Sequence, residues 1–265
     1  MSMVELASSD TQDLVGTALS IAAKLPEPRP LWFRGHECQN HTLVPSLARR
    51  VGSPEELFEK ERRLITRFRQ RSLPFWPSGY PQNDWEQLFA MQHYGIPTRL
   101  LDWSENLFVA LYFASRQHAH PDEGSCNPVI WVIDPIGWNR DVPHLRGTSD
   151  EIGIMTTDSD DLERYAPISP GSALPRRYIH PVSLYGTYNS ARIVAQRGSF
   201  TVAGNSLTPL EELADATTVA SLWRIEINAA REQIMADLSA LGFTESMIFP
   251  DLTGLSREIV ALENV

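Results

Sequence analysis

Apolar residues recur at helical spacing in several parts of the chain. From Leu14 to Leu25 they mark one face of a helix, which Pro26 ends. A second helix begins at Ser53, a typical N-cap residue, with Pro54 directly after it. The same spacing predicts further helices over about residues 84–95, 107–114, 229–242 and 250–263.

Four shorter stretches have the patterns of strands. Residues 31–34 and 128–134 are rich in aromatic and β-branched side chains, and residues 221–227 alternate strictly. Residues 193–202, around the sequence QRG, predict two strands or one strand with a bulge. Helices and strands follow one another without a regular βαβ rhythm. We therefore expect an α+β single domain, in which helices flank a mixed or antiparallel sheet.

Composition narrows the choice of partner and compartment. The 265 residues carry a formal net charge of −10, which argues against nucleic acid as a partner. The basic segment 60–71 indicates a solvated helix face. The start of the chain lacks signal-peptide features, and no apolar run approaches the ~20 residues that span a bilayer, so we expect a cytoplasmic protein with no membrane contact. Cys38 and Cys126 form no CxxC pair, so neither a disulfide framework nor a zinc site is expected.

Arg34 stands out in the sequence LWFRGHE. It follows an apolar run and precedes Gly35, which gives close backbone access beside a planar cation. A guanidinium group suits a phosphate or a carboxylate, which it grips with two parallel hydrogen bonds, and Glu37 lies nearby. The alternative is that Arg34 pairs with an internal carboxylate such as Asp102 and has a structural role.

A second group of polar residues precedes the helix expected at 107–114. Asp102 with Glu105 has capping-box spacing, and Ser104 is the rival N-cap. Neither explains Arg99, because a cation near a helix N-terminus opposes the helix dipole. We expect Arg99 to meet Arg34 at one solvent-accessible hollow, where an anion from outside neutralises both. The spacing of His, Cys and acidic residues predicts no metal site.

Several stretches together resemble the FRG domain family, named after an aromatic-Arg-Gly motif that is here Phe33, Arg34 and Gly35. They are WFRG, LVPSLAR, HYGIPTRLLDWSENLFVALYFA, AQRGSFT and LGFTESMIFPDLTGL. The resemblance extends over residues 28–257, with an N-terminal helix in 1–27 and the end of a C-terminal helix in 258–265. The family is associated with bacterial phage defence, so the resemblance implies a defence or toxin-type effector.

The order of elements is also similar to the ADP-ribosyltransferase fold. That resemblance implies that Arg34 holds the ribose and phosphate of NAD, and that Ser104 takes the place of a Ser or Thr at a strand end. Gln196 falls where that fold has its catalytic Glu. A neutral amide supplies no anionic stabilisation, so either another carboxylate serves or the site binds a nucleotide without processing it. The candidate carboxylates are Glu37, Asp102, Glu105 and Glu226.

Two main hypotheses follow. In the first, the protein is an enzyme that takes NAD as its substrate for ADP-ribosyl transfer, to a protein target, or for hydrolysis. Arg34 and Arg99 would hold phosphate, and Phe33, Tyr94 or Trp103 would stack on a ring. In the second, the protein is a non-catalytic sensing module that binds a nucleotide or another phosphorylated small molecule. A metal-dependent nuclease and a purely internal salt-bridge network are further alternatives.

Overall fold

A seven-stranded sheet organises the chain. The structure is a computed structural model that describes residues 3–76, 79–116, 126–146, 153–167, 178–187, 191–214 and 221–263. The strand order is β1-β7-β4-β2-β3-β6-β5. β1 and β7 are parallel, and the other neighbours are antiparallel. This mixed sheet with its flanking helices confirms the expected α+β class. The strands are β1 (Val4–Ser8), β2 (Trp32–His36), β3 (Leu100–Ser104), β4 (Val129–Ile133), β5 (Val182–Leu184), β6 (Gly198–Val202) and β7 (Leu222–Ile227).

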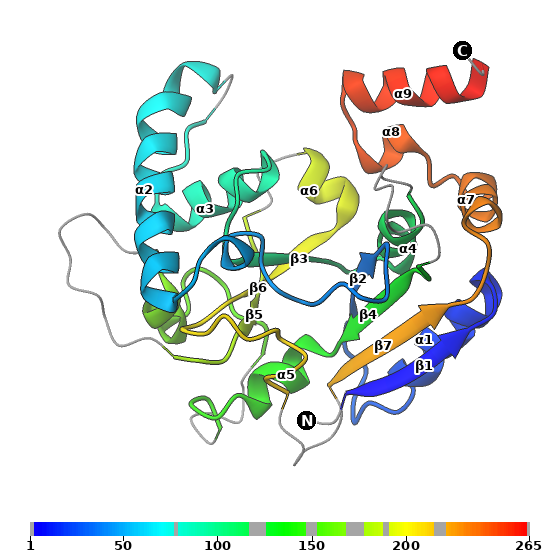
Figure 1. The fold of residues 1–265 in the computed structure, drawn as a ribbon, viewed down its shortest axis with the longest axis horizontal. Coiled ribbons are helices and arrows are strands. Elements are labelled where there is room, and N and C mark those ends of the chain that lie inside the picture. The colour runs from blue at the N-terminus through cyan, green and yellow to red at the C-terminus, as the bar shows by residue number, and fades with distance from the viewer. Residues whose placement is uncertain are drawn as a thin grey trace.

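Helices cover both faces of this sheet (Figure 1). Where the apolar pattern extends over several helical turns, the helix bounds follow it closely. Ser53 caps α2, since its hydroxyl accepts a hydrogen bond from the Glu56 amide at 3.2 Å. The helices are α1 (Thr11–Ala22), α2 (Pro54–Ser72), α3 (Asp84–His93), α4 (Leu107–Ser115), α5 (Pro135–Asp141), α6 (Ala191–Gln196), α7 (Arg231–Ala240), α8 (Glu245–Ile248) and α9 (Leu252–Glu263). The described residues also contain three 3₁₀ turns, namely η1 (Ala48–Arg50), η2 (Leu73–Phe75) and η3 (Asp160–Tyr165).

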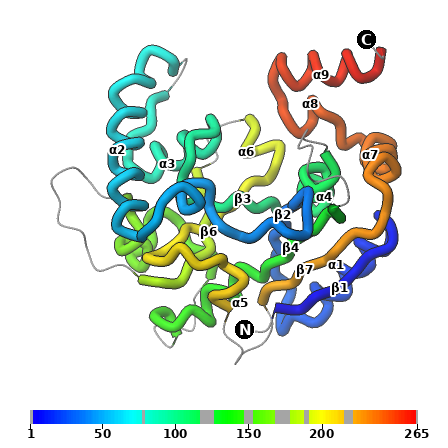
Figure 2. The backbone as a smooth tube through the Cα atoms, viewed as in Figure 1, coloured from blue at the N-terminus to red at the C-terminus, as the bar shows by residue number. Residues whose placement is uncertain are grey.

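Two hydrophobic cores lie on opposite faces of the sheet because successive strand residues point to opposite sides. Trp32 and Trp131 pack in the core shared with α2, α3 and α5. Phe33 and Val132 pack in the core shared with α1, α4 and α7. In the tube of Figure 2, α2 and α3 lie at one end of the sheet, and α1, β1 and β7 lie at the other.

Several elements differ from the sequence-based expectations. A strand, β1, precedes α1 in the segment that we expected to be a helix alone. Residues 191–196 form α6, where two strands or a bulged strand were expected, and β6 begins only at Gly198. Residues 100–104, which the strand patterns described above do not include, form β3 between β2 and β6.

The expectation about the cysteines is wrong. Cys38 and Cys126 form a disulfide with a Cα–Cα distance of 4.9 Å, although 88 residues separate them in sequence. It lies where β2 ends and β4 is about to begin, because His36 pairs with Val129. No helix in the described part of the chain combines the length and the apolar character needed to cross a membrane.

Candidate functional site

A cavity of about 460 Å³ opens where β2 and β3 separate. The pairing of these strands rests on one position, Phe33 opposite Ser104, in the described structure. Beyond it the strands diverge, and their side chains line the gap together with α3, α4, α6 and β6. The cavity residues that we predicted from sequence are Phe33, Arg34, Gly35, Glu37, Asp102, Trp103, Ser104 and Gln196.

Arg34 lies at this divergence, held by two protein acceptors. Its Nε donates to Nε2 of His36 at 3.1 Å, and its Nη1 donates to the main-chain carbonyl of Asp102 at 2.7 Å. The Asp102 carboxylate is 3.9 Å from Nη1. Nη2 has no hydrogen-bond partner among the residues described, and the side chain keeps 19% of its surface exposed. The guanidinium is therefore fixed in place with donors still facing the cavity.

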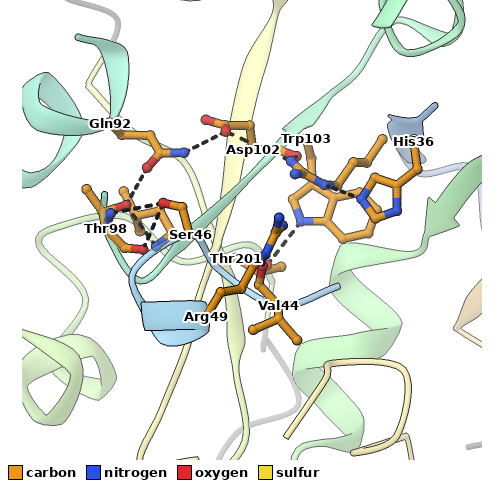
Figure 3. Close-up of polar contacts among 11 residues, drawn as sticks. His36, Val44, Ser46, Arg49, Gln92, Thr98, Asp102, Trp103 and Thr201 are labelled. Carbon is orange, nitrogen blue, oxygen red and sulfur yellow. Dashed lines mark hydrogen bonds and ion pairs between the residues drawn. The ribbon is translucent and has the colours of Figure 1, made fainter. Parts of the chain in front are cut away.

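His36 is the neighbour that fixes Arg34. The imidazole is buried, and burial together with the adjacent Arg34 charge holds its pKa well below the ordinary histidine range. The ring is therefore neutral, so Nε2 accepts from Arg34 while Nδ1 lies 3.2 Å from the His41 carbonyl and 3.2 Å from Trp131 Nε1. Figure 3 shows His36 beside Trp103 at the edge of this group.

Asp102 presents its carboxylate to the cavity from β3. Its side chain is 56% exposed, and Oδ2 accepts from the Gln92 amide nitrogen at 2.6 Å. The Thr98 hydroxyl donates to the amide oxygen of the same Gln92, which sets the direction of that side chain (Figure 3). Asp102 does not start a helix as expected, because Asn106 caps α4 by accepting from the Phe108 amide at 2.9 Å.

Two cavity cations were missed from sequence. Arg49, on η1, donates from Nε to the Val44 carbonyl at 2.8 Å, and Figure 3 shows its guanidinium directed toward Trp103. Arg192, on α6, lies 4.8 Å over the ring of Phe249. The signal for Arg49 was its place in LVPSLAR, one of the family-like stretches, whereas Arg192 had no comparable signal.

Ser104 and Gln196 come together where β3 ends and α6 leads into β6. The Ser104 hydroxyl donates to the Gln196 carbonyl at 2.6 Å, since Ser104 pairs with Gly198 across β3 and β6. The Gln196 side chain donates to the Ile248 carbonyl at 3.1 Å. Both residues line the cavity, but the Ser104 hydroxyl is occupied by main-chain groups.

Gly35 has a structural role that the sequence did not suggest. A Cβ atom on this residue would lie 2.0 Å from the Ala110 carbonyl oxygen and 2.7 Å from the Ala114 nitrogen. The missing side chain therefore lets α4 pack directly on β2. This contact, and not only ligand access, requires glycine after Arg34.

Arg99 does not reach the cavity, so the expected convergence of Arg34 and Arg99 is wrong. Arg99 is fully buried, with Nε 2.6 Å from the Glu61 carboxylate and Nη1 2.9 Å from the Ala203 carbonyl. Its remaining nitrogen donates to the Tyr165 carbonyl. The apolar run around Arg99 thus holds an internal ion pair, since a buried guanidinium needs partners for its donors.

Three other candidates also lie outside the cavity lining. Glu105 accepts from the Tyr185 hydroxyl at 2.9 Å. Tyr94 is 63% exposed, with its ring 6.0 Å from that of Trp76. Glu226 lies on β7, where it accepts from the Asn127 side chain at 2.8 Å. Asp102 and Glu37 are therefore the carboxylates that remain beside Arg34 from the candidates named above.

The described residues contain no group of three or more His, Cys, Asp or Glu side chains that suits a metal ion. Residues 29–123 match the family model of the FRG domain. The matched segment includes Arg34, Arg49 and Asp102, whereas Arg192 and Gln196 follow it in sequence. Comparison with curated proteins and with solved structures found no match.

Proposed function

We propose that the chain, whose residues 29–123 match the FRG domain family, binds a phosphate-containing nucleotide such as NAD in the cavity beside Arg34. One observation carries the proposal. Arg34, Arg49 and Arg192 come from three separate elements and line one cavity, although the whole chain has a net charge of −10. In the described lining of the cavity these three guanidiniums accompany the carboxylates of Asp102 and Glu37, and the charge of Asp251 also acts on Arg192, so the guanidiniums offer donors to an added anion.

The size and the lining of the cavity favour a nucleotide over a simple anion. A volume of about 460 Å³ lies in the range of small-molecule sites, which are largely apolar with a few polar groups that fix orientation. Phe89, Phe113 and Phe200 supply apolar wall beside the cations. The exposed oxygen atoms of Asp102 suit the hydroxyls of a ribose, since a carboxylate is an acceptor.

Hydrolysis of NAD or ADP-ribosyl transfer is the activity that this arrangement supports. In hydrolysis, the bond between the nicotinamide nitrogen and ribose C1′ breaks, and the nitrogen keeps the electron pair. A water oxygen forms the new bond to C1′ and releases one proton. Asp102 would act as the carboxylate that stabilises positive charge on the sugar, because Gln196 is neutral.

A sensing module that binds without turnover is the second candidate. The neutral side-chain amide of Gln196, which lines the cavity and donates to the Ile248 carbonyl, is the observation that favours it. The loss of one well-placed electrostatic group commonly lowers a rate by about 100- to 1,000-fold. A protein with such a site retains affinity for its ligand while turnover becomes negligible.

Calorimetric titration with NAD, followed by an assay for free nicotinamide, tests both candidates. We expect NAD to bind the wild type and to bind Arg34→Gln at least about tenfold more weakly, because a charge-assisted hydrogen bond is lost. Arg71→Gln is the matched control, since Arg71 is exposed on α2 and lies outside the cavity lining. A thermal melt of each variant separates lost binding from lost folding.

The outcomes assign the function. Nicotinamide release that depends on Arg34 identifies an enzyme, and binding without release identifies the sensing module. If folded Arg34→Gln binds NAD as the wild type does, or if the wild type binds neither NAD nor ADP-ribose, the proposal is wrong. The proposed defence or toxin-type role predicts that expression in a bacterial host slows growth, and that Arg34→Gln relieves the effect.

A further inference from the structure

The three cavity guanidiniums fall into two groups, which approach Asp102 from different elements. Arg34, on β2, is 3.9 Å from the Asp102 carboxylate. Burial lowers the pKa of Arg34, the charge of Asp102 opposes this shift, and the nearby charge of Arg49 adds to it. Arg192 enters from α6, which packs against α8. Burial lowers the pKa of Arg192 as well, and Asp102 is the main charge that opposes the shift.

Both groups keep donors for a ligand. Arg49 uses only Nε, toward Val44, so its two Nη atoms have no protein partner among the described residues. Arg192 forms no hydrogen bond or ion pair within the described structure, and its guanidinium carbon lies 4.8 Å over the centre of the Phe249 ring. Face stacking leaves the N–H groups at the edge of the guanidinium plane free to bind an anion.

We propose that the cavity has two phosphate subsites, one at Arg34 and Arg49 and one at Arg192, and that its ligand is a nucleotide with two phosphate positions separated by a hydroxyl-bearing ribose. NADP, with a phosphate on the 2′ oxygen of its adenosine, meets this description and NAD does not. The inference rests on the proposed function, which it narrows to a ligand class.

The place of Asp102 selects separated phosphates over adjoining ones. Its carboxylate is more than half exposed and repels a phosphate that lies directly beside it. The same carboxylate accepts a hydrogen bond from a hydroxyl, and its Oδ1 has no partner among the described residues. A ribose hydroxyl at Asp102, with one phosphate at Arg34 and Arg49 and another at Arg192, would therefore engage all of these groups.

Titration calorimetry with three adenosine compounds tests the inference on the whole protein. The probes are adenosine 5′-monophosphate, adenosine 2′,5′-bisphosphate and ADP, whose two phosphates adjoin. We expect the bisphosphate to bind at least about tenfold more tightly than the monophosphate, and ADP to gain less than the bisphosphate. Arg192→Gln should abolish the gain of the bisphosphate over the monophosphate, with both affinities measured on the same variant. Arg71→Gln should change neither affinity.

Three results would overturn the inference. They are equal affinity of the wild type for the monophosphate and the bisphosphate, an equal gain with ADP, and a gain that survives in folded Arg192→Gln. If these occur while the monophosphate still binds in an Arg34-dependent way, the proposed function stands and only the two subsites are rejected. If no adenosine compound binds, both proposals fail.

Discussion

Arg34 and His36, two residues apart on β2, form a hydrogen bond of 3.1 Å in which the guanidinium donates and a neutral imidazole accepts. Side chains two apart on a strand point to the same face, so the pair stands on the cavity side of the sheet. The imidazole must stay unprotonated at Nε2 for this bond to form. The orientation of the main candidate anion-binding group thus depends on a titratable neighbour.

Stability should therefore fall as the pH is lowered. Burial and Arg34 depress the pKa of folded His36, while a histidine in the unfolded chain titrates near 6.5. The contribution of His36 is fully present above about pH 6.5 and decreases below it by up to ~1.4 kcal/mol per pH unit. Urea unfolding at pH 8, 6.5 and 5 measures this, with His36→Gln as a non-titrating control. Equal acid sensitivity of the two proteins would contradict the prediction.

Substitution of Arg99 should lower the free energy of unfolding and should not act on ligand binding in the cavity. Arg99→Met leaves the Glu61 carboxylate buried without its counter-ion, which typically costs about 3–5 kcal/mol. The double variant Arg99→Met with Glu61→Met should recover much of that loss, because no isolated charge remains. Urea unfolding of the three proteins provides the comparison. A loss under about 1 kcal/mol in Arg99→Met would show that the pair is not stabilised as its burial indicates.

Gly35→Ala should disrupt the packing of α4 on β2. The new Cβ would meet backbone atoms of Ala110 and Ala114, which cannot rotate away as a side chain can, so we expect a loss of at least about 1–3 kcal/mol. Gly16→Ala is the matched control, because Gly16 lies within α1 and an added Cβ there would have no neighbouring atom within 4 Å. That change should stabilise the protein by up to about 1 kcal/mol, since alanine favours helices. Thermal denaturation of both variants measures the difference. Similar changes in melting temperature for Gly35→Ala and Gly16→Ala would refute the packing role of Gly35.

The disulfide should contribute measurably to stability. Cross-linking residues 88 positions apart restricts the unfolded chain, which in the chain-entropy description is worth about 4.6 kcal/mol. The variant with both Cys38→Ser and Cys126→Ser should melt at a lower temperature than the oxidised wild type. Added dithiothreitol should lower the melting temperature of the wild type and leave that of the double variant unchanged. An effect of the same size on both would exclude the disulfide as its cause.

Local patterns predicted much of the fold, and long-range contacts account for most of what they missed. The cap at Ser53 and the apolar strand at 129–133 are local features that the structure retains. β1 owes its conformation to parallel pairing with β7, near the other end of the chain, which no local pattern reveals. The alternation of Ile193 and Ala195 favoured a strand in a segment that forms α6.

The candidate site shows the same division. Arg34 was identified because a cation that ends an apolar run needs a partner, and the structure places it in the cavity. The same reasoning selected Arg99. Its partner Glu61 lies 38 residues earlier in the sequence, on α2, and no local pattern identified it as a partner. Arg192 escaped notice because its importance comes only from the position of α6 beside the opening.

The divergence of β2 and β3 after Phe33 and Ser104 has an evolutionary consequence. The opening is produced by the course of the main chain, and part of its lining, including Arg49 and Arg192, lies on η1, α3 and α6, outside the paired strands. We therefore expect replacement of Arg49 or Arg192 to alter which molecule binds without loss of any strand pairing. A scaffold of this kind can acquire a new specificity by single substitutions while its architecture is inherited intact.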